Sequence, residues 1–169
     1  NHHPEETTAM PNTITLPGTT LEVSDLCCGA NVFGWSIHDQ AEANHLLDHL
    51  LSQGVNFFDS ADMYVQWHPG GHGGESEKML GQWIRESGIN RSDVVIVTKV
   101  GKMTARPGLS PENIRLAAHE SLDRLGLDHI DLYYAHFDDQ TVALEDSLGA
   151  FAELIDEGLV SYIAASNYT

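Results

Sequence analysis

The sequence is poor in basic residues, with eight Lys and Arg against 25 Asp and Glu and a formal net charge of −17. A chain with this balance repels the phosphates of nucleic acids and of anionic membranes, so neither is expected as a partner. The acidic surface fits a protein kept soluble by its charge or one adapted to a salty environment, and we favour the first interpretation.

Long apolar runs and cysteines are also lacking. No apolar run approaches membrane-spanning length, an apolar content of 41% is that of a globular protein, and no basic-then-apolar leader opens the sequence. The two cysteines, Cys27 and Cys28, are neighbours. Adjacent strand residues point to opposite faces, so we expect two buried thiols and neither a disulfide nor a metal pair. These absences predict a soluble protein of the reducing cytoplasm.

Composition and length divide the chain into two regions. Residues 1–12, which open Asn-His-His-Pro-Glu-Glu, are expected to be a disordered tail or the remnant of an affinity tag. Residues 13–169 have the length of one domain that can bury its own core.

The hydrophobic pattern predicts alternating strands and helices after an opening hairpin. The hairpin, at 13–16 and 21–23, turns at Pro17-Gly18. Strict alternation implies a parallel sheet, either an open doubly wound sheet or a (β/α)₈ barrel. The first strand-to-helix turn has Gly29 and Gly34 but no G-x-G-x-x-G, which favours the TIM-barrel type, with the hairpin and about five β/α units present. The expected strands are 26–30, 55–59, 94–99, 130–136 and 160–165, and the expected helices are 39–53, 76–87, 110–125 and 143–157.

Four polar side chains stand where three successive strands end. Asp59 closes the strand at 55–59, and Tyr64 follows in the loop. Lys99 and His136 close the next two strands. The carboxyl ends of parallel strands meet at one edge, where sites collect. Taken singly, each residue has an ordinary structural explanation: Asp59 as a helix cap or turn acid, Lys99 as a solvated strand end, Tyr64 as a loop aromatic and His136 as a core histidine. Only the four together, in this order, favour a catalytic role.

The four groups together suit reduction of a carbonyl. A tyrosine is a poor acid near neutral pH, but a neighbouring ammonium stabilises its phenolate, and a carboxylate fixes the ammonium in place. An imidazole beside them can bind a carbonyl oxygen. This arrangement is typical of hydride transfer from a nicotinamide to a carbonyl carbon.

The stretches 57–64, 74–77, 97–99, 122–136 and 165–168 resemble the aldo-keto reductases, in order along the chain. The resemblance implies a (β/α)₈ barrel whose floor is closed by the hairpin, with NADPH extended over its mouth. It also implies a catalytic tetrad in which Tyr64 is the general acid. By position, the tetrad is Asp59, Tyr64, Lys99 and His136, and the cofactor-binding residues are Gly29, Ala30, Asn31, Asp59, Ser166 and Asn167.

Near the mouth of such a barrel, Val32, Phe33, Tyr64 and Trp67 suggest an apolar pocket for a small carbonyl substrate. The loop after Trp67 contains two histidines among glycines. It offers no rigid geometry for a metal, so we expect no metal site and interpret the loop as mobile.

The sequence stops just after the fifth strand, short of three further strands and of the adenosine 2′-phosphate site that the resemblance implies. If the chain truly ends at Thr169, we expect a homo-oligomer. Two alternatives to an NADPH-dependent reductase stay open. One is a non-catalytic scaffold or regulatory subunit with the same fold, and the other is an inactive half-barrel that self-associates.

Overall fold

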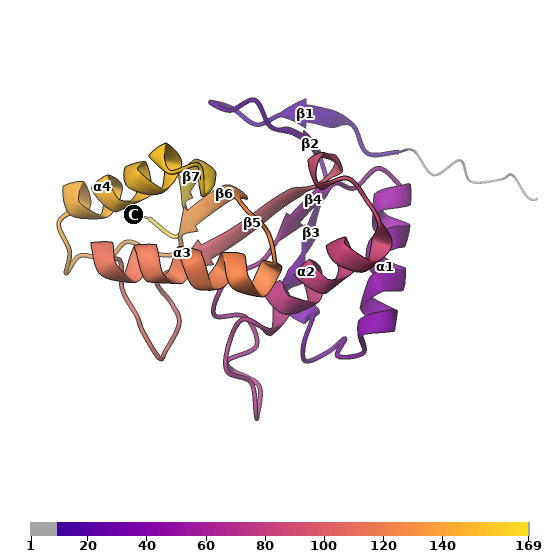
Figure 1. Ribbon diagram of the computed structural model, residues 1–169, viewed down its shortest axis with the longest axis horizontal. Coiled ribbons are helices and arrows are strands. Elements are labelled where there is room, and N and C mark those ends of the chain that lie inside the picture. Colours follow the sequence, from indigo (N-terminus) through magenta and orange to yellow (C-terminus); the bar gives the residue numbers. More distant parts are fainter. Residues whose placement is uncertain (1–9, 169) are drawn as a thin grey trace, which may run out of the picture.

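The computed structural model describes residues 10–168, and its element order is the predicted one. A two-stranded antiparallel hairpin, β1 and β2, precedes a five-stranded parallel sheet of order β3-β4-β5-β6-β7 (Figure 1). Residues 1–9 of the predicted tail lie outside the described residues, whereas Asn12 is hydrogen-bonded to Asp25 at 3.0–3.1 Å. The strands are β1 (Thr13–Thr15), β2 (Glu22–Ser24), β3 (Cys27–Gly29), β4 (Phe57–Asp59), β5 (Val95–Val100), β6 (Ile130–Ala135) and β7 (Val160–Ala165).

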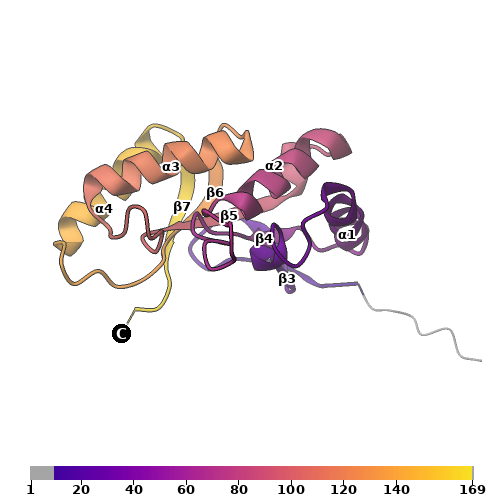
Figure 2. The same ribbon diagram turned by 90° about the horizontal axis from the view of Figure 1, so that it is seen from below.

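Each strand of the sheet pairs with the next in sequence, without the reversal of order that an open doubly wound sheet shows. Because parallel crossovers are right-handed, successive crossovers in one direction place their helices on the same face. Figure 2 shows the four helices arrayed on one side of the sheet. The fold is therefore a partial TIM-type barrel of about five units. The helices are α1 (Gln40–Ser52), α2 (Glu75–Ser87), α3 (Pro111–Leu125) and α4 (Leu144–Asp156), with short 3₁₀ turns η1 (Ala30–Val32) and η2 (Arg91–Asp93).

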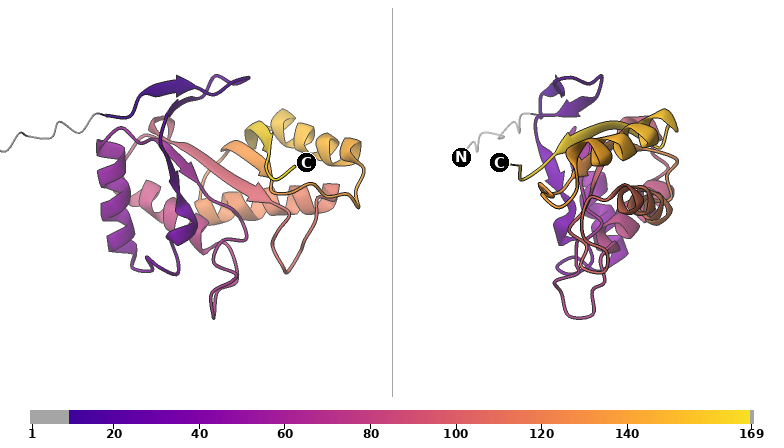
Figure 3. Two further views of the ribbon diagram at one scale, coloured as in Figure 1. Left: turned by 180° about the vertical axis from the view of Figure 1, so that it is seen from behind. Right: turned by 90° about the vertical axis from the view of Figure 1, so that its left-hand side faces the viewer.

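The hairpin lies at the amino ends of the sheet strands, opposite the loops 60–74 and 101–110 (Figures 1 and 3). Asn56, just before β4, accepts from the Ser24 backbone at 2.7 Å and donates to the Glu22 carbonyl at 3.0 Å. The Tyr162 hydroxyl of β7 contacts Thr20 at 2.9–3.1 Å. The hairpin thus covers one end of the sheet and leaves the carboxyl ends of the strands to the loops.

The core lies between the sheet and the helices, on the helical faces that the periodicity predicts. Phe58 and Trp83 pack with ring centroids 5.0 Å apart, and the indole N–H of Trp83 donates to Asp48 at 2.8 Å. Helix α3 starts as predicted, since the Ser110 hydroxyl accepts from the backbone N–H of Asn113 and Pro111 occupies the first turn. Its predicted inward residues, Ile114, Ala117, Ala118, Leu122 and Leu125, are all buried.

The prediction of two buried thiols is wrong. Cys28 is half-buried and packs against the core, whereas Cys27 is exposed. The alternation along β3 is as expected, but Cys27 faces away from the core, on the side of the sheet that none of the described helices covers. Partial burial, with the charge of Asp59 adding to it, raises the pKa of Cys27 to about 12 and that of Cys28 to about 11, so both thiols stay protonated.

Helix α4 also departs from its predicted packing. The pattern placed Leu144, Leu148, Phe151 and Ile155 inward, but only Phe151 is buried. The apolar stripe is wider than the surface that α3 and β7 cover, so the other three remain exposed, and Leu144 and Leu148 line one pocket with Ile163 of β7. Within residues 10–168, no helix has the length and apolar character needed to cross a membrane.

Candidate active site

The four residues of the predicted tetrad converge on the carboxyl edge of the sheet. Asp59 is the last residue of β4 and lies beside Gly29 of β3, Lys99 belongs to β5, and His136 follows β6. Backbone bonds fix the register of these ends, since the His136 N–H donates to the Val100 carbonyl at 2.9 Å. Tyr64 is carried by the loop after β4, which is held where the Asp62 N–H donates to the Lys99 carbonyl at 3.2 Å.

Lys99 is the centre of this group. Its ammonium lies 2.7 Å from the Asp59 carboxylate, 3.0 Å from the Tyr64 hydroxyl and 2.8 Å from the Ser60 carbonyl. An ammonium has three N–H donors, so all of them have acceptors. The Tyr64 hydroxyl accepts one of these bonds, which leaves its own proton free to donate elsewhere. The Lys99 side chain is only 8% exposed, and Asp59 is 31% exposed.

His136 stands beside Tyr64, with ring centroids 6.3 Å apart and nearly perpendicular planes. Burial, with the positive charges of Lys99 and Lys102, lowers the pKa of His136 from 6.5 to about 4. The imidazole is therefore neutral near neutral pH. Its Nδ1 is buried and has no hydrogen-bond partner among the described residues.

The residues predicted to hold a cofactor surround the same edge. Ser166 and Asn167 follow β7, and the Asn167 amide nitrogen donates to the His136 carbonyl at 3.0 Å and to the Ser166 hydroxyl at 2.9 Å. Gly29 and Asn31 are exposed at the end of β3, whereas the Ala30 side chain is fully buried. The Ala30 carbonyl is also occupied, accepting from the Ser76 hydroxyl at 2.7 Å.

The predicted substrate pocket is brought together only in part. Trp67 is 47% exposed, and its ring lies 5.9 Å from that of Tyr64. Val32 is half-buried against the core. Phe33 is fully buried within the hydrophobic core and has no surface with which to meet a substrate. Phe33 is therefore a core residue, because the 3₁₀ turn after β3 directs it toward the helices.

Sequence reasoning assigned no role to a buried polar network beneath the tetrad. Glu77, fully buried, binds Arg124 and the Thr98 hydroxyl, each at 2.5 Å. Glu77 and these two partners lie on three different elements, so their pairing could not be read from spacing along the chain. The network ties α2 to α3 and β5. Position 74 must be glycine for Arg124 to lie where it does, since a Cβ on residue 74 would stand 2.4 Å from the Arg124 side chain.

Asp62, two residues before Tyr64, is buried near this network but, unlike Glu77, has no close partner in the described part of the chain. It is fully buried, and neither carboxylate oxygen has a hydrogen-bond partner among the described residues. The nearest guanidinium, of Arg106, is 3.9 Å away. Burial and the charge of Glu77 raise the pKa of Asp62 to about 7, against the lowering effect of Arg106 and Arg124. This carboxyl therefore takes up its proton at a pH well above that at which an exposed aspartate does.

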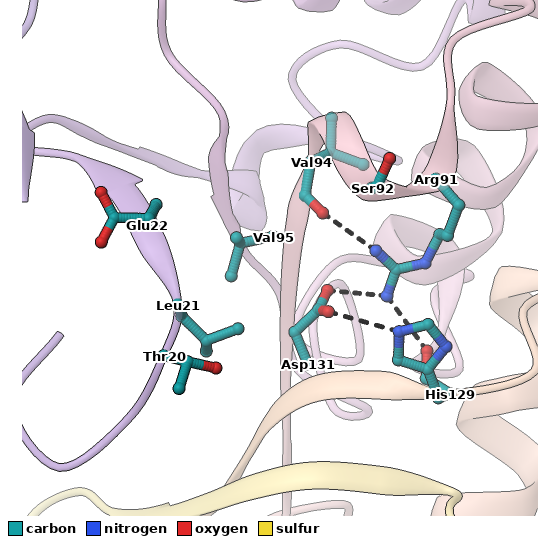
Figure 4. A pocket seen from close by; sticks show the side chains of 9 residues that line it. All are labelled: Thr20, Leu21, Glu22, Arg91, Ser92, Val94, Val95, His129 and Asp131. Atoms are coloured by element: carbon teal, nitrogen blue, oxygen red, sulfur yellow. Dashed lines mark hydrogen bonds and ion pairs between the residues drawn. The ribbon is translucent and has the colours of Figure 1, made fainter. Parts of the chain in front are cut away.

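A cavity of about 670 Å³ lies at the hairpin end of the sheet, away from the tetrad (Figure 4). The arginine in its lining, Arg91, is already engaged with Asp131 at 2.6 Å and with the carbonyls of Val94 and His129 at 2.9 and 3.1 Å. These bonds fasten η2 to β6, and we assign the cluster no chemistry. Among residues 10–168, no cluster of His, Cys, Asp or Glu could hold a metal ion.

Comparison with known proteins identifies the family to which this chain is similar. The model of the Aldo/keto reductase family matches residues 25–169. The uncharacterized oxidoreductase YrpG of Bacillus subtilis (strain 168) is 36% identical over 158 residues, which are 89% of this chain and 47% of YrpG. A probable voltage-gated potassium channel subunit beta of Arabidopsis thaliana is 36% identical over 152 residues, covering 88% of this chain and 44% of that protein.

A solved structure supports the same relationship. The holo form of the aldo-keto reductase AKR11C1 from Bacillus halodurans superposes with a TM-score of 0.77 at 29% identity, covering 92% of this chain and 50% of that one. This chain thus spans about half the length of these relatives. On its sequence motifs, its fold and this family match, the chain belongs to the aldo/keto reductase family.

Proposed function

We propose that this chain carries the catalytic residues of a cytoplasmic, NADPH-dependent oxidoreductase that reduces small aldehydes and ketones to alcohols. The observation that supports it best is the saturation of the Lys99 ammonium by Asp59, Tyr64 and the Ser60 carbonyl. This arrangement orients Tyr64 so that its hydroxyl proton is the one left to donate to a carbonyl oxygen.

In this proposal Tyr64 protonates the oxygen of the substrate as the carbonyl is reduced. The phenolate that remains faces the Lys99 ammonium, 3.0 Å away, which stabilises the negative charge. Asp59 holds the ammonium in that position. The neutral imidazole of His136 supplies a second hydrogen-bonding group beside the Tyr64 ring without adding positive charge to the site.

The residues at this edge fit a nicotinamide. Because the Asn167 amide nitrogen binds the His136 carbonyl and the Ser166 hydroxyl, the pair is held next to the tetrad. The Asn167 side-chain oxygen then remains as an acceptor for a carboxamide N–H. Gly29, the register partner of Asp59, leaves the adjacent strand end without a side chain. When bound, NADPH supplies the hydride that adds to the carbonyl carbon, and its choice over NADH rests on the family resemblance.

A second candidate is a regulatory subunit that binds the cofactor without turning over a substrate. The similarity to a probable potassium channel subunit beta favours it. Two measurements separate the candidates. A fluorescence titration tests NADPH binding, and the loss of NADPH absorbance tests reduction of a nitro-substituted benzaldehyde. Binding with turnover supports the reductase, binding without turnover of any aldehyde supports the regulatory subunit, and absence of binding contradicts both.

A further inference from the structure

Two buried serines, Ser60 and Ser76, connect the end of β4 to helix α2. Ser60 directly follows Asp59, and Ser76 lies in the first turn of α2. Both side chains are fully buried, and their hydroxyl oxygens are 2.9 Å apart. The Ser76 hydroxyl also donates to the Ala30 carbonyl at 2.7 Å. A buried hydroxyl costs free energy unless it is hydrogen-bonded, and here each of the two hydroxyls has a partner.

The direction of these bonds follows from the number of protons. A serine hydroxyl has one proton to donate and two lone pairs that accept. The Ser76 proton is used on the Ala30 carbonyl, which can only accept. The proton between the two hydroxyls therefore comes from Ser60, so that Ser60 donates to Ser76 and Ser76 donates to Ala30.

Ser60 is held on three sides by this arrangement. Its backbone N–H donates to the Val97 carbonyl of β5 at 2.9 Å, and its hydroxyl is bonded to Ser76. Its own carbonyl accepts from the Lys99 ammonium at 2.8 Å. Of the three acceptors around that ammonium, this carbonyl is the one that lies outside the tetrad. The bond to Ser76 therefore helps to fix one of the three groups that orient the Lys99 ammonium.

Resting on the proposed function, we propose that Ser60 and Ser76 are positioning residues, which fix the third acceptor of the Lys99 ammonium and so keep that ammonium at the Tyr64 hydroxyl. An ammonium on a flexible four-carbon stem has three rotatable donors, so its acceptors decide where it points. If the Ser60 carbonyl moves, the N–H bonds toward Asp59 and Tyr64 move with it. Both serine hydroxyls are buried and engaged, so neither is available to a substrate.

A serine hydroxyl with a purely structural role occurs elsewhere in the fold and supplies the control. Ser147 of α4 is buried and donates to the Leu109 carbonyl at 2.7 Å, the length of the bond from Ser76 to Ala30. It joins a helix to a backbone carbonyl in the same way, on an element that carries no residue of the tetrad. Ser147→Ala therefore measures the effect of losing such a bond without moving Lys99.

The first readout is the Lys99 ammonium itself, followed by ¹H–¹⁵N NMR of lysine side chains in the full protein without substrate. Lys99→Met identifies the signal by its loss. Because all three N–H groups have acceptors, the signal of the parent should exchange slowly with water. Ser60→Ala keeps the bond from Ser76 to Ala30 and removes only the tether of residue 60. It should speed this exchange about tenfold, as expected for loss of one hydrogen bond.

The second readout is turnover of a nitro-substituted benzaldehyde with NADPH. Ser60→Ala should lower kcat about tenfold and change KM and NADPH affinity less than about twofold, because the ammonium acts on Tyr64 in the chemical step. Ser76→Ala should lower kcat at least as much, since it removes both bonds of the pair. Ser147→Ala should leave the Lys99 signal and kcat unchanged, although urea unfolding should show that it loses stability.

The inference is overturned if Ser60→Ala folds and leaves either the Lys99 exchange or kcat within about twofold of the parent. The serine pair would then serve only to join α2 to the sheet. An equal loss of kcat in Ser147→Ala would overturn it as well. If Ser60→Ala speeds the Lys99 exchange but the parent reduces no aldehyde, the result contradicts the proposed function and leaves the positioning of the ammonium standing.

Discussion

The buried carboxyl of Asp62 makes stability depend on pH in a direction that a single substitution can isolate. Its pKa is raised from 3.8 to about 7, chiefly by burial and then by the charge of Glu77. The folded protein therefore holds this proton more tightly than the unfolded chain does. The stability that Asp62 contributes is fully present below pH 3.8 and is lost as the pH rises to about 7.

The magnitude follows from the width of that window. A shift of about three pH units, at about 1.4 kcal/mol each, gives about 4 kcal/mol of stability lost between the two ends of the window. His136 has the opposite effect on stability, because burial lowers its pKa from 6.5 to about 4. The stability that His136 contributes to the protein is lost as the pH falls from 6.5 to about 4. The pH profile of the parent thus mixes two opposing contributions, and only a comparison of variants separates them.

Asp62→Asn removes the ionisable group and keeps the shape of the side chain. Urea unfolding followed by circular dichroism, at several pH values between about 4 and 8, gives the free energy of unfolding of parent and variant. We expect the parent to lose stability relative to the variant as the pH rises, by up to about 4 kcal/mol. Asp123→Asn, which removes an exposed carboxylate from α3, is the matched control and should show no such trend.

The reasoning would be refuted by a difference between parent and Asp62→Asn that does not vary with pH. It would also be refuted if the parent gained stability relative to the variant on going from low to high pH. In that case Asp62 would be an ordinary ionised partner of Arg106, and the 3.9 Å separation would close in solution.

Three further predictions concern the tetrad and the exposed apolar surface formed by α4 and β7. Lys99→Met should reduce carbonyl turnover at least about a hundredfold, and Asp59→Asn should reduce it less because the Lys99 ammonium keeps its charge. Steady-state kinetics measure both effects, and a larger loss of turnover in Asp59→Asn than in Lys99→Met would contradict this prediction. The His136 imidazole should titrate near pH 4 by NMR, and a midpoint near 6.5 would show a solvated ring. A protein of these 169 residues alone should self-associate through its apolar α4–β7 surface. Leu148→Glu should then shift its sedimentation toward that of a monomer, and a parent that already sediments as a monomer would contradict this prediction.

The order of elements and the position of the tetrad follow from local sequence. Three successive strands end at or beside a polar residue, namely Asp59, Lys99 and His136, and parallel pairing brings such ends to one edge whatever the details of packing. The helical faces of α2 and α3 were predictable for the same reason, because periodicity selects the face that is buried.

What the sequence could not show depends on contacts between distant elements. Whether Phe33 points into the core or toward the mouth is decided by the 3₁₀ turn, since both surroundings accept an aromatic ring. The exposure of Cys27 depends on which side of the sheet the helices cover, and that of Leu148 depends on how much of α4 is covered by α3 and β7. Burial of Asp62 without a close partner has no sequence signal at all, because an Asp in a loop is ordinarily solvated.

The central claim is that Tyr64, oriented by Lys99, is the acid in carbonyl reduction. The most direct measurement compares the parent with Tyr64→Phe in the full protein, following NADPH oxidation by a nitro-substituted benzaldehyde and NADPH affinity by fluorescence. The variant keeps the ring that packs on Trp67 and loses only the hydroxyl. We predict a loss of turnover of about 10²–10⁴-fold with NADPH affinity nearly unchanged. Turnover within a few-fold of the parent would contradict the claim.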